Sequence, residues 1–325
     1  MPIIEHLPYP AAGYTMDKSP LCRASLDRSD AAMRVSVTVN ESAITMTQNE
    51  MATLIAKRFI QRKSAKAIQY GDDYRPVAKW NPDGTRAFLY PFMMSDIEDH
   101  LSGKATYGHY LLDENDTVKL FAFDIDLEEK GSWVELPDLS DINYNISNEE
   151  YDAKIKVHEF NPRLAWRDRS HPGRRWLKFQ LRSLADKISR EIFETLEIPT
   201  ASAYSGNKGV HVYGFTGTVK ASEAREAAEI VLDSIGGFEL SKGKNFFKTT
   251  NQDPYTGYPN LSVEIFPKQE SLSGKDLGNL MRLPLGRNAK SSDPTFFVDQ
   301  RRGMFELSPH SNPVELLTSG NPWRG

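Results

Sequence analysis

The chain has 325 residues, a single cysteine, Cys22, and a formal net charge of −4 at pH 7. This length allows one large domain or two small ones, and one cysteine excludes an internal disulfide and any zinc site built from several cysteines. The slightly acidic balance excludes a uniformly basic surface for nucleic acid, but it leaves room for local basic grooves. No apolar run approaches the ~18 residues of a membrane span, and the N-terminus has no secretory pattern, so we expect no membrane contact and a cytoplasmic location.

Few segments in the N-terminal part of the chain show the periodicity of regular elements. Residues 1–45 are predicted to form a partly irregular extension, in which only 33–39 alternates in the manner of a strand. Thr47 followed by Glu50 is a capping-box pattern, and it predicts an amphipathic helix after it. A second, short helix is predicted near Ser95, which would be its N-cap.

The rest of the chain mixes strands with helices. Predicted strands over 106–112 and 118–127 are joined by a turn, and a polar, irregular surface excursion is expected over 128–162. A long helix over 175–196 leads into a strand, a glycine loop and a further strand. The later predicted elements are a helix over 222–236, a strand over 260–267 and a short apolar piece over 278–286. This mixture, with hairpin-like pairs in it, predicts an α+β fold.

Two aspartates interrupt an apolar run in the stretch FAFDIDLEEK, which begins at Phe121. Side chains two residues apart on a strand point the same way, so Asp124 and Asp126 would lie side by side on one face. Like charges so close repel, and a divalent cation with oxygen ligands would cancel that repulsion. The alternative is a pair of surface aspartates at the end of a strand.

A second candidate site is the glycine loop in SGNKGVHVYGF. Gly206 and Gly209 allow a tight turn whose backbone N–H groups form an anion nest. Lys208 adds a positive charge, Ser205 adds a hydroxyl, and His211 on the following strand can donate to a phosphate oxygen. The alternative is a hairpin turn whose histidine is an ordinary satisfied polar residue.

Two charged residues lie in apolar segments further on. Glu264 sits on a predicted strand between apolar neighbours, where an unpaired carboxylate is costly to bury. It could be a third metal ligand, or an edge-strand residue that faces water. Arg282 lies within an apolar segment, so its guanidinium is expected to reach a fixed anion, either a phosphate or the carboxylate of a structural ion pair.

Taken in chain order, these features form a recognisable series: hhhDhD, where h is apolar, then S-G-x-K-G-x-H, then an acid on a strand. The series resembles the archaeo-eukaryotic primase superfamily, the catalytic domain of primases and primase-polymerases. The segments EIFPKQ and LGNLMRLPLG are similar to the third-motif region of phage, plasmid and mobile-element members. The resemblance covers residues from about 95 to 290.

The resemblance implies a primase-polymerase fold of the α+β class, with an RRM-like antiparallel catalytic sheet, flanking helices and a smaller N-terminal α/β module. It places the catalytic domain at 46–302, with the N-terminal module at about 46–117 and the catalytic module at about 118–302. Residues 303–325 would be a C-terminal tail and a candidate linker to further domains.

The function implied by the resemblance is that of a template-dependent DNA primase-polymerase in phage or plasmid replication. Such an enzyme transfers a nucleotide from a nucleoside triphosphate to a 3′-hydroxyl and releases pyrophosphate. Asp124, Asp126 and Glu264 would hold two Mg²⁺ or Mn²⁺ ions, and these three with His211 are the expected catalytic residues. The expected nucleotide-binding residues are Ser205, Gly206, Lys208, His211 and Arg282.

A basic segment with tryptophans, residues 161–182, has the composition of a surface that binds phosphates and stacks bases. The alternative is a solvated helix start whose tryptophans lie in the core. The expected partners are a single-stranded or primed DNA template, nucleoside triphosphates and a helicase, fused or separate, with no membrane. The candidate nucleic-acid-binding residues are Arg163, Trp166, Arg167, Arg174, Arg175, Trp176 and Arg287.

Other classes of function remain open on the sequence. A metal-dependent nuclease also uses clustered carboxylates with a lysine or histidine, and it would cleave without nucleoside triphosphates. An inactive primase-like module would only bind DNA or nucleotides. A rolling-circle initiator is disfavoured, because the chain has no paired His-x-His.

Overall fold

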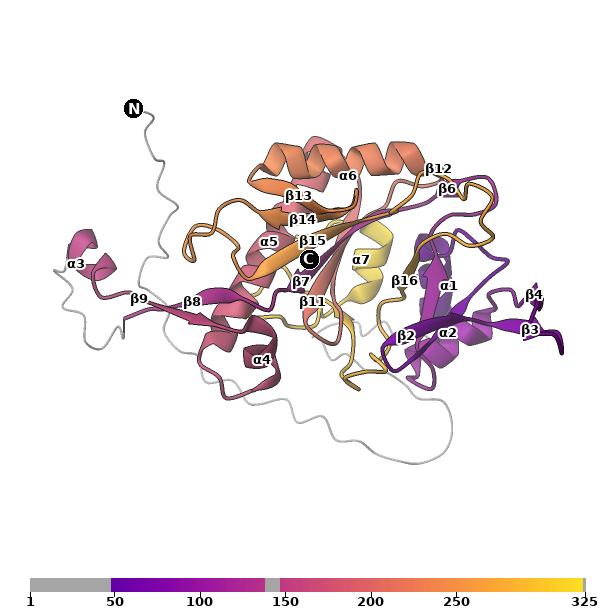
Figure 1. The fold of residues 1–325 in the computed structure, drawn as a ribbon, viewed down its shortest axis with the longest axis horizontal. Helices are drawn as coiled ribbons and strands as arrows, with labels where there is room; N and C mark the ends of the chain where they lie inside the picture. Colours follow the sequence, from indigo (N-terminus) through magenta and orange to yellow (C-terminus); the bar gives the residue numbers. More distant parts are fainter. Residues whose placement is uncertain (1–47, 138–146, 324–325) are drawn as a thin grey trace, which may run out of the picture. The chain divides into compact units, whose positions relative to one another are not determined.

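The computed structural model describes residues 48–137 and 147–323 as a mixed α/β structure with antiparallel sheets, which confirms the predicted α+β class (Figure 1). The helices are α1 (Gln48–Phe59), α2 (Met94–Leu101), α3 (Asn148–Asp152), α4 (Pro162–Arg167), α5 (Gly173–Thr195), α6 (Ala221–Ile235) and α7 (Pro313–Ser319). The first strands are β1 (Ala67–Tyr70), β2 (Asp73–Pro76), β3 (Ala78–Trp80), β4 (Arg86–Leu89), β5 (Tyr107–Tyr110), β6 (Thr117–Val118), β7 (Phe121–Leu127), β8 (Gly131–Glu135) and β9 (Lys156–Phe160). The later strands are β10 (Thr200–Tyr204), β11 (Gly209–Gly214), β12 (Val219–Lys220), β13 (Phe238–Lys242), β14 (Phe246–Thr249), β15 (Leu261–Phe266), β16 (Leu280–Arg282) and β17 (Phe296–Phe297).

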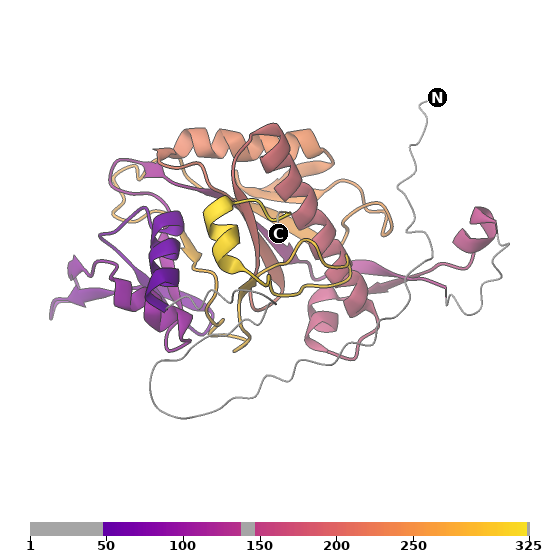
Figure 2. The same cartoon turned by 180° about the vertical axis from the view of Figure 1, so that it is seen from behind.

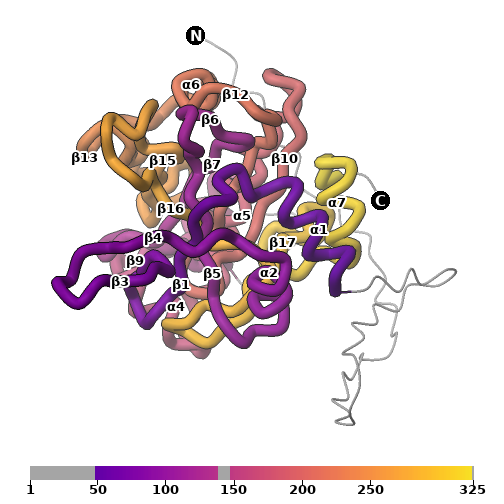
Figure 3. Tube along the Cα trace, turned by 90° about the vertical axis from the view of Figure 1, so that its right-hand side faces the viewer, coloured from indigo at the N-terminus to yellow at the C-terminus, as the bar shows by residue number. Residues whose placement is uncertain are grey.

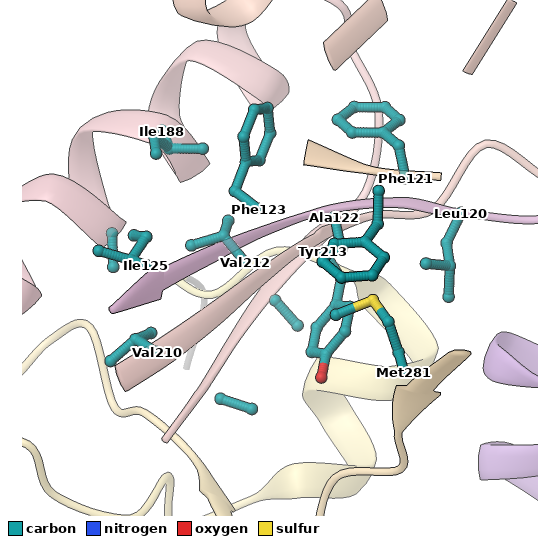
Figure 4. Packing of buried hydrophobic residues seen from close by; sticks show 14 of the residues in the cluster. Leu120, Phe121, Ala122, Phe123, Ile125, Ile188, Val210, Val212, Tyr213 and Met281 are labelled. Atoms are coloured by element: carbon teal, nitrogen blue, oxygen red, sulfur yellow. The ribbon is translucent and has the colours of Figure 1, made fainter. Parts of the chain in front are cut away.

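The larger sheet has seven strands in the order β13-β14-β15-β7-β11-β10-β17, so the aspartate-bearing strand β7 is central. Phe123 and Ile125 of β7 are fully buried on one face, which α5 and α6 cover. Figure 4 shows Ile188 of α5 on the same side as these two residues. Burying each such side chain stabilises the fold by about 1.5–3 kcal/mol. Because strand side chains alternate, this burial turns the aspartates toward the opposite face.

The opposite face of the large sheet is covered only in part. Tyr213 and Met281 lie there (Figure 4), and the ring of Phe59 from α1 packs edge-on against Tyr213 at 5.0 Å. These contacts cover the end of the face where β7 begins. The end that carries the aspartates is left to polar side chains.

A smaller sheet has the order β16-β5-β1-β2 and lies beside α1 and α2 (Figure 3). Its edge strand β16 comes from residues 280–282, far along the chain from the other three strands, and pairs antiparallel with β5. The sequence predicted only a short apolar piece here. The return of the chain places Arg282 beside the aspartate-bearing face of the large sheet.

The strands predicted on either side of the turn are confirmed as β5 and β7, which belong to different sheets. Two other local predictions were wrong. The excursion over 128–162 is not irregular in its described part, because β8 and β9 pair along their whole length. The cap of α2 is Met93 rather than Ser95, since the Asp96 carboxylate accepts a hydrogen bond of 2.7 Å from the Met93 N–H. The strand expected over 33–39 lies outside the described residues.

The described part of the predicted C-terminal tail folds onto the rest of the chain. Leu316 and Leu317 of α7 are buried, and Figure 2 shows α7 next to α1. Arg58 of α1 donates hydrogen bonds to the carbonyls of Leu317 (2.6 Å) and Thr318 (2.9 Å). Whether further domains follow stays a prediction. Over the residues that the structure describes, no helix has both the length and the apolar character needed to span a bilayer.

Candidate active site

Strand register gathers three of the predicted catalytic residues into one row across the large sheet. Asp124 on β7 is the direct partner of His211 on β11 and of Glu264 on β15. Directly opposed residues of antiparallel strands share a face, and neighbouring strands lie about 4.8 Å apart. The Nε2 atom of His211 lies 3.4 Å from Oδ1 of Asp124. Residues separated by as many as 140 positions in sequence therefore meet through backbone pairing alone.

Asp126 lies one step further along the same face, opposite Gly209. A Cβ atom on Gly209 would lie 2.4 Å from Asp126 Oδ1 and 2.4 Å from the carbonyl oxygen of Ile125. Glycine is therefore needed for β11 to lie against this carboxylate. Asp126 also forms an ion pair with Lys208, which comes from the loop before β11.

The glycine loop is held by hydrogen bonds at both of its ends. The N–H of Ser205 donates to the Gly209 carbonyl at 2.9 Å, and the Gly209 N–H donates to Ser205 Oγ at 3.2 Å. Gly206 has a φ of +73°, which favours glycine, and a Cβ there would press on Asn288 and Thr295. These contacts define the conformation of the turn.

A pocket of about 370 Å³ opens over this face of the sheet. Six residues predicted from the sequence line it: Asp124, Asp126, Ser205, Lys208, His211 and Arg282. Glu264 and Gly206 are not among the lining residues. Glu264 is one strand away from the pocket's aspartate, where it forms an ion pair of 2.6 Å with Lys268.

Sequence reasoning missed five other residues of the pocket wall: Gln69, Asp72, Asn207, Asn288 and Lys290. Gln69 and Asp72 come from the end of β1 and the turn before β2, and Lys290 forms an ion pair of 2.6 Å with Asp72. Asn207 lies within the predicted loop and could have been included. No sequence pattern links the turn between β1 and β2 to the loop, because they meet only through tertiary packing.

The pocket disfavours the charged forms of its own aspartates. Burial first, and then repulsion from the Glu264 carboxylate, raises the pKa of Asp124 to about 6. The pKa of Asp126 is also raised, by burial and then by Asp124. Nearby cations oppose the rise at Asp124: Lys208, Arg282 and Lys268.

His211 is neutral in this surrounding. Burial lowers its pKa to about 3, and the positive charge of Arg282 adds to the effect. Its Nδ1 lies 3.1 Å from the hydroxyl of Tyr213, whose own pKa is raised by burial. When that hydroxyl donates to Nδ1, the ring proton is on Nε2, the nitrogen that faces Asp124.

The carboxylates suit a hard divalent cation because they offer oxygen ligands and because one of those oxygens has no hydrogen-bond donor among the described residues. Oδ1 of Asp124 is buried and accepts no hydrogen bond, although His211 lies nearby. Oxygen ligands of this kind are those that Mg²⁺ and Mn²⁺ take. Across 48–137 and 147–323, however, no group of three acids, histidines or cysteines is close enough to hold an ion. Lysines form ion pairs with Asp126 and Glu264. The carboxylates therefore fit the metal by ligand chemistry alone.

Arg282 forms no ion pair with any described residue, so the structural ion pair considered from the sequence is not seen within that part of the chain. Its charge nevertheless lowers the pKa values of Asp124 and His211. A guanidinium that lines a polar pocket without a carboxylate partner is available to an anionic ligand.

The two tryptophans predicted to stack bases are buried instead. Trp166 and Trp176 are only 5% and 4% exposed, so neither offers a face to a nucleic acid. Trp166 Nε1 donates to the carbonyl of Asn207, and the guanidinium of Arg174 lies 4.6 Å from the Trp166 ring centroid. Trp166 and Arg174 therefore support the glycine loop through the Asn207 carbonyl.

The remaining candidates for nucleic-acid contact lie at the surface. Arg163 is half-buried and pairs with Glu129 at 2.7 Å. Arg167, Arg175 and Arg287 are exposed, and Arg175 lies over the Phe305 ring at 4.6 Å. Contact of these arginines with a template stays a prediction.

Comparison with known proteins identifies the family to which this chain belongs. The family "TOTE conflict system, Archaeo-Eukaryotic Primase domain" matches residues 76–309. A comparison with curated proteins gave no match. A solved structure, the polymerase domain from Mycobacterium tuberculosis ligase D in complex with DNA, is 12% identical and covers 90% of this chain and 94% of its own, with a TM-score of 0.36. The family match confirms the resemblance found in the sequence, and the chain belongs to the archaeo-eukaryotic primase domain family of TOTE conflict systems.

Proposed function

We propose that the chain is a template-dependent DNA primase-polymerase, which joins a nucleotide from a nucleoside triphosphate to a 3′-hydroxyl and releases pyrophosphate. The observation that carries the proposal is the row of Asp124, His211 and Glu264 on one face of the large sheet. Asp124 and His211, with Asp126 beside them, line the same pocket as the glycine loop. Acids for metal ions and a cradle for phosphates are the two parts that nucleotidyl transfer needs. Its place in phage or plasmid replication, and a helicase partner, stay predictions.

Asp124, Asp126 and Glu264 would hold two Mg²⁺ or Mn²⁺ ions, which supply a lowered pKa for the attacking hydroxyl and charge neutralisation for the leaving group. The reaction requires no covalent bond to the protein, so the side chains contribute by positioning the reactants and by stabilising charge.

The cationic and N–H groups of the pocket would bind the triphosphate. Arg282 has no carboxylate partner among the described residues and Lys208 can exchange Asp126 for a phosphate oxygen over a short distance. The N–H on Nε2 of neutral His211 can donate to a phosphate oxygen without adding charge. Backbone N–H groups of the loop add further donors.

The test replaces one carboxylate at a time by its amide, which keeps its size. Asp124→Asn and Asp126→Asn should each lower extension of a primed template by about 10³-fold or more, because an amide cannot supply the negative ligand. Extension is measured with labelled nucleotides in Mg²⁺ and in Mn²⁺, with circular dichroism as a check on folding. Glu159→Gln, on the exposed strand β9, is the matched control and should extend normally.

The same assay separates the other classes of function. Cleavage of the template without nucleoside triphosphates would indicate a metal-dependent nuclease. Binding of DNA and nucleotide with no product in either metal would indicate an inactive module. Wild-type extension by either aspartate variant would remove the proposed metal site.

A further inference from the structure

Exposed aromatic and methionine side chains gather in one short part of the described chain, residues 70–94. They lie on β1, on the hairpin of β3 and β4, and just after it; Figure 1 shows this hairpin projecting from the small sheet. An exposed apolar cluster on a folded protein commonly marks a binding surface. The members and their exposed fractions are Tyr70 (58%), Trp80 (55%), Phe88 (48%), Tyr90 (41%), Met93 (55%) and Met94 (39%).

Cations are interleaved with these rings. Lys79 Nζ lies 5.9 Å from the centroid of Phe88, whose ring is 5.1 Å from that of Tyr90. The guanidinium of Arg75 lies 5.7 Å from the centroid of Tyr70. Arg75 lies on β2 and Lys79 on β3, four residues apart in the chain, and both side chains are exposed. We call Tyr70, Arg75, Lys79, Phe88 and Tyr90 the aromatic track.

The aromatic track begins at the wall of the candidate active site. Tyr70 lies between Gln69 and Asp72, both of which line the pocket. Gln69 Oε1 accepts a hydrogen bond of 3.2 Å from the Ala289 N–H, and Asp72 pairs with Lys290. The turn between β1 and β2 is therefore fixed to the loop that forms the far side of the pocket.

We propose that the aromatic track binds the single-stranded template as it approaches the pocket. This inference rests on the proposed function, because a nucleotide in the pocket must pair with a template base at its wall. Aromatic faces stack on any base, and cations beside them reach the phosphates, which is how proteins bind single strands without reading sequence. Within residues 48–107 the large exposed apolar side chains are aromatic or methionine, without the exposed leucine, isoleucine or valine of an aliphatic protein-docking groove.

The direct test measures binding without catalysis. The probe is a fluorescein-labelled oligo-dT single strand, and its anisotropy is followed in EDTA without nucleotide. The double variant Phe88→Ala/Tyr90→Ala should weaken binding by roughly 30-fold or more, the effect of removing two stacking rings. Leu240→Ala removes an equally exposed apolar side chain (53%) from β13 and should bind as wild type does.

Two further measurements make the outcome independent of how the double variant folds. Lys79→Gln should flatten the dependence of log affinity on log salt by about 0.7, the slope of one phosphate contact on a single strand. Photo-crosslinking of wild-type protein to a bromodeoxyuridine strand should label Tyr70, Phe88 or Tyr90. The aromatic track is refuted by equal oligo-dT affinity in the folded double variant, as expected if this surface docks a protein, or by crosslinks confined to other segments.

Failure of the proposed function would look different. Asp124→Asn should bind oligo-dT as wild type does, because the track does not use that carboxylate. Normal extension by Asp124→Asn would remove the metal site and leave the binding result standing. If Asp124→Asn failed to bind oligo-dT, strand binding would depend on the active-site carboxylate, and the inference that the aromatic track binds the strand independently of that site would be overturned.

Discussion

His211 has each ring nitrogen assigned to a different neighbour, Tyr213 at Nδ1 and Asp124 at Nε2. His211 and Tyr213 are buried, and Tyr213 keeps its hydroxyl protonated because burial raises its pKa. Tyr213 therefore acts as a positioning residue, which selects the tautomer that presents an N–H to the pocket.

Removing only that hydroxyl should weaken nucleotide binding. Tyr213→Phe keeps the ring that packs against Phe59, so the melting temperature should change little, while the nucleotide Kd rises about 3- to 10-fold for one lost hydrogen bond. Nucleotide titration followed by fluorescence measures this change. In a His211→Ala background the same substitution should have no further effect, and an undiminished effect there would show that Tyr213 does not act through His211.

The buried carboxylate of Asp124 also lowers the stability of the fold at neutral pH. Its folded-state pKa of about 6 lies above the ordinary 3.8, so the folded protein favours the protonated form and loses stability as pH rises from about 4 to 6. Asp124→Asn has no such penalty. In EDTA it should exceed wild type by about 1–3 kcal/mol in unfolding free energy at pH 7, and the gain should vanish near pH 4. Urea unfolding across this range measures it, and a difference independent of pH would contradict the cause.

At the scale of elements, the approach of β11 to β7 depends on one missing side chain. Gly209→Ala would set a Cβ against Asp126 and the Ile125 carbonyl, so we expect a loss of about 1–3 kcal/mol of stability together with loss of extension activity. Gly303→Ala is the control, because a Cβ there would meet only Glu306, at 3.7 Å. Thermal unfolding and the extension assay together test this. An active, stable Gly209→Ala protein would mean that β11 can move away without cost.

The same elements show what a sequence can and cannot predict. The alternation in FAFDIDL was enough to predict a strand with both aspartates on one face, and two glycines were enough to predict the loop before β11. The pairing of Asp124 with both His211 and Glu264 depends on register between distant strands, which no local pattern encodes. Composition alone misplaced Trp166, because its burial is decided by how α4 packs behind the loop.

At the scale of the whole molecule, the pocket is built from parts that lie far apart in sequence. Gln69 and Asp72 come from the small sheet, the aspartates come from the large sheet, and Asn288 and Lys290 come from the segment after β16. A reading of motifs in order finds the members that carry recognisable chemistry. It misses residues that belong to the pocket only because of where they lie in the fold. Gln69 and Asp72, which form the pocket wall next to the aromatic track, were therefore absent from the predicted site.

The strand β16 has a consequence for how this chain can be divided. Because one of the two partners of β5 is supplied by residues 280–282, a piece that stopped near residue 117 would expose an unsatisfied row of backbone N–H and C=O groups along one edge of β5. The small sheet is completed by a strand that is synthesised late, so we expect it to close only after most of the chain has emerged. The strand that completes the small sheet also carries Arg282 to the pocket.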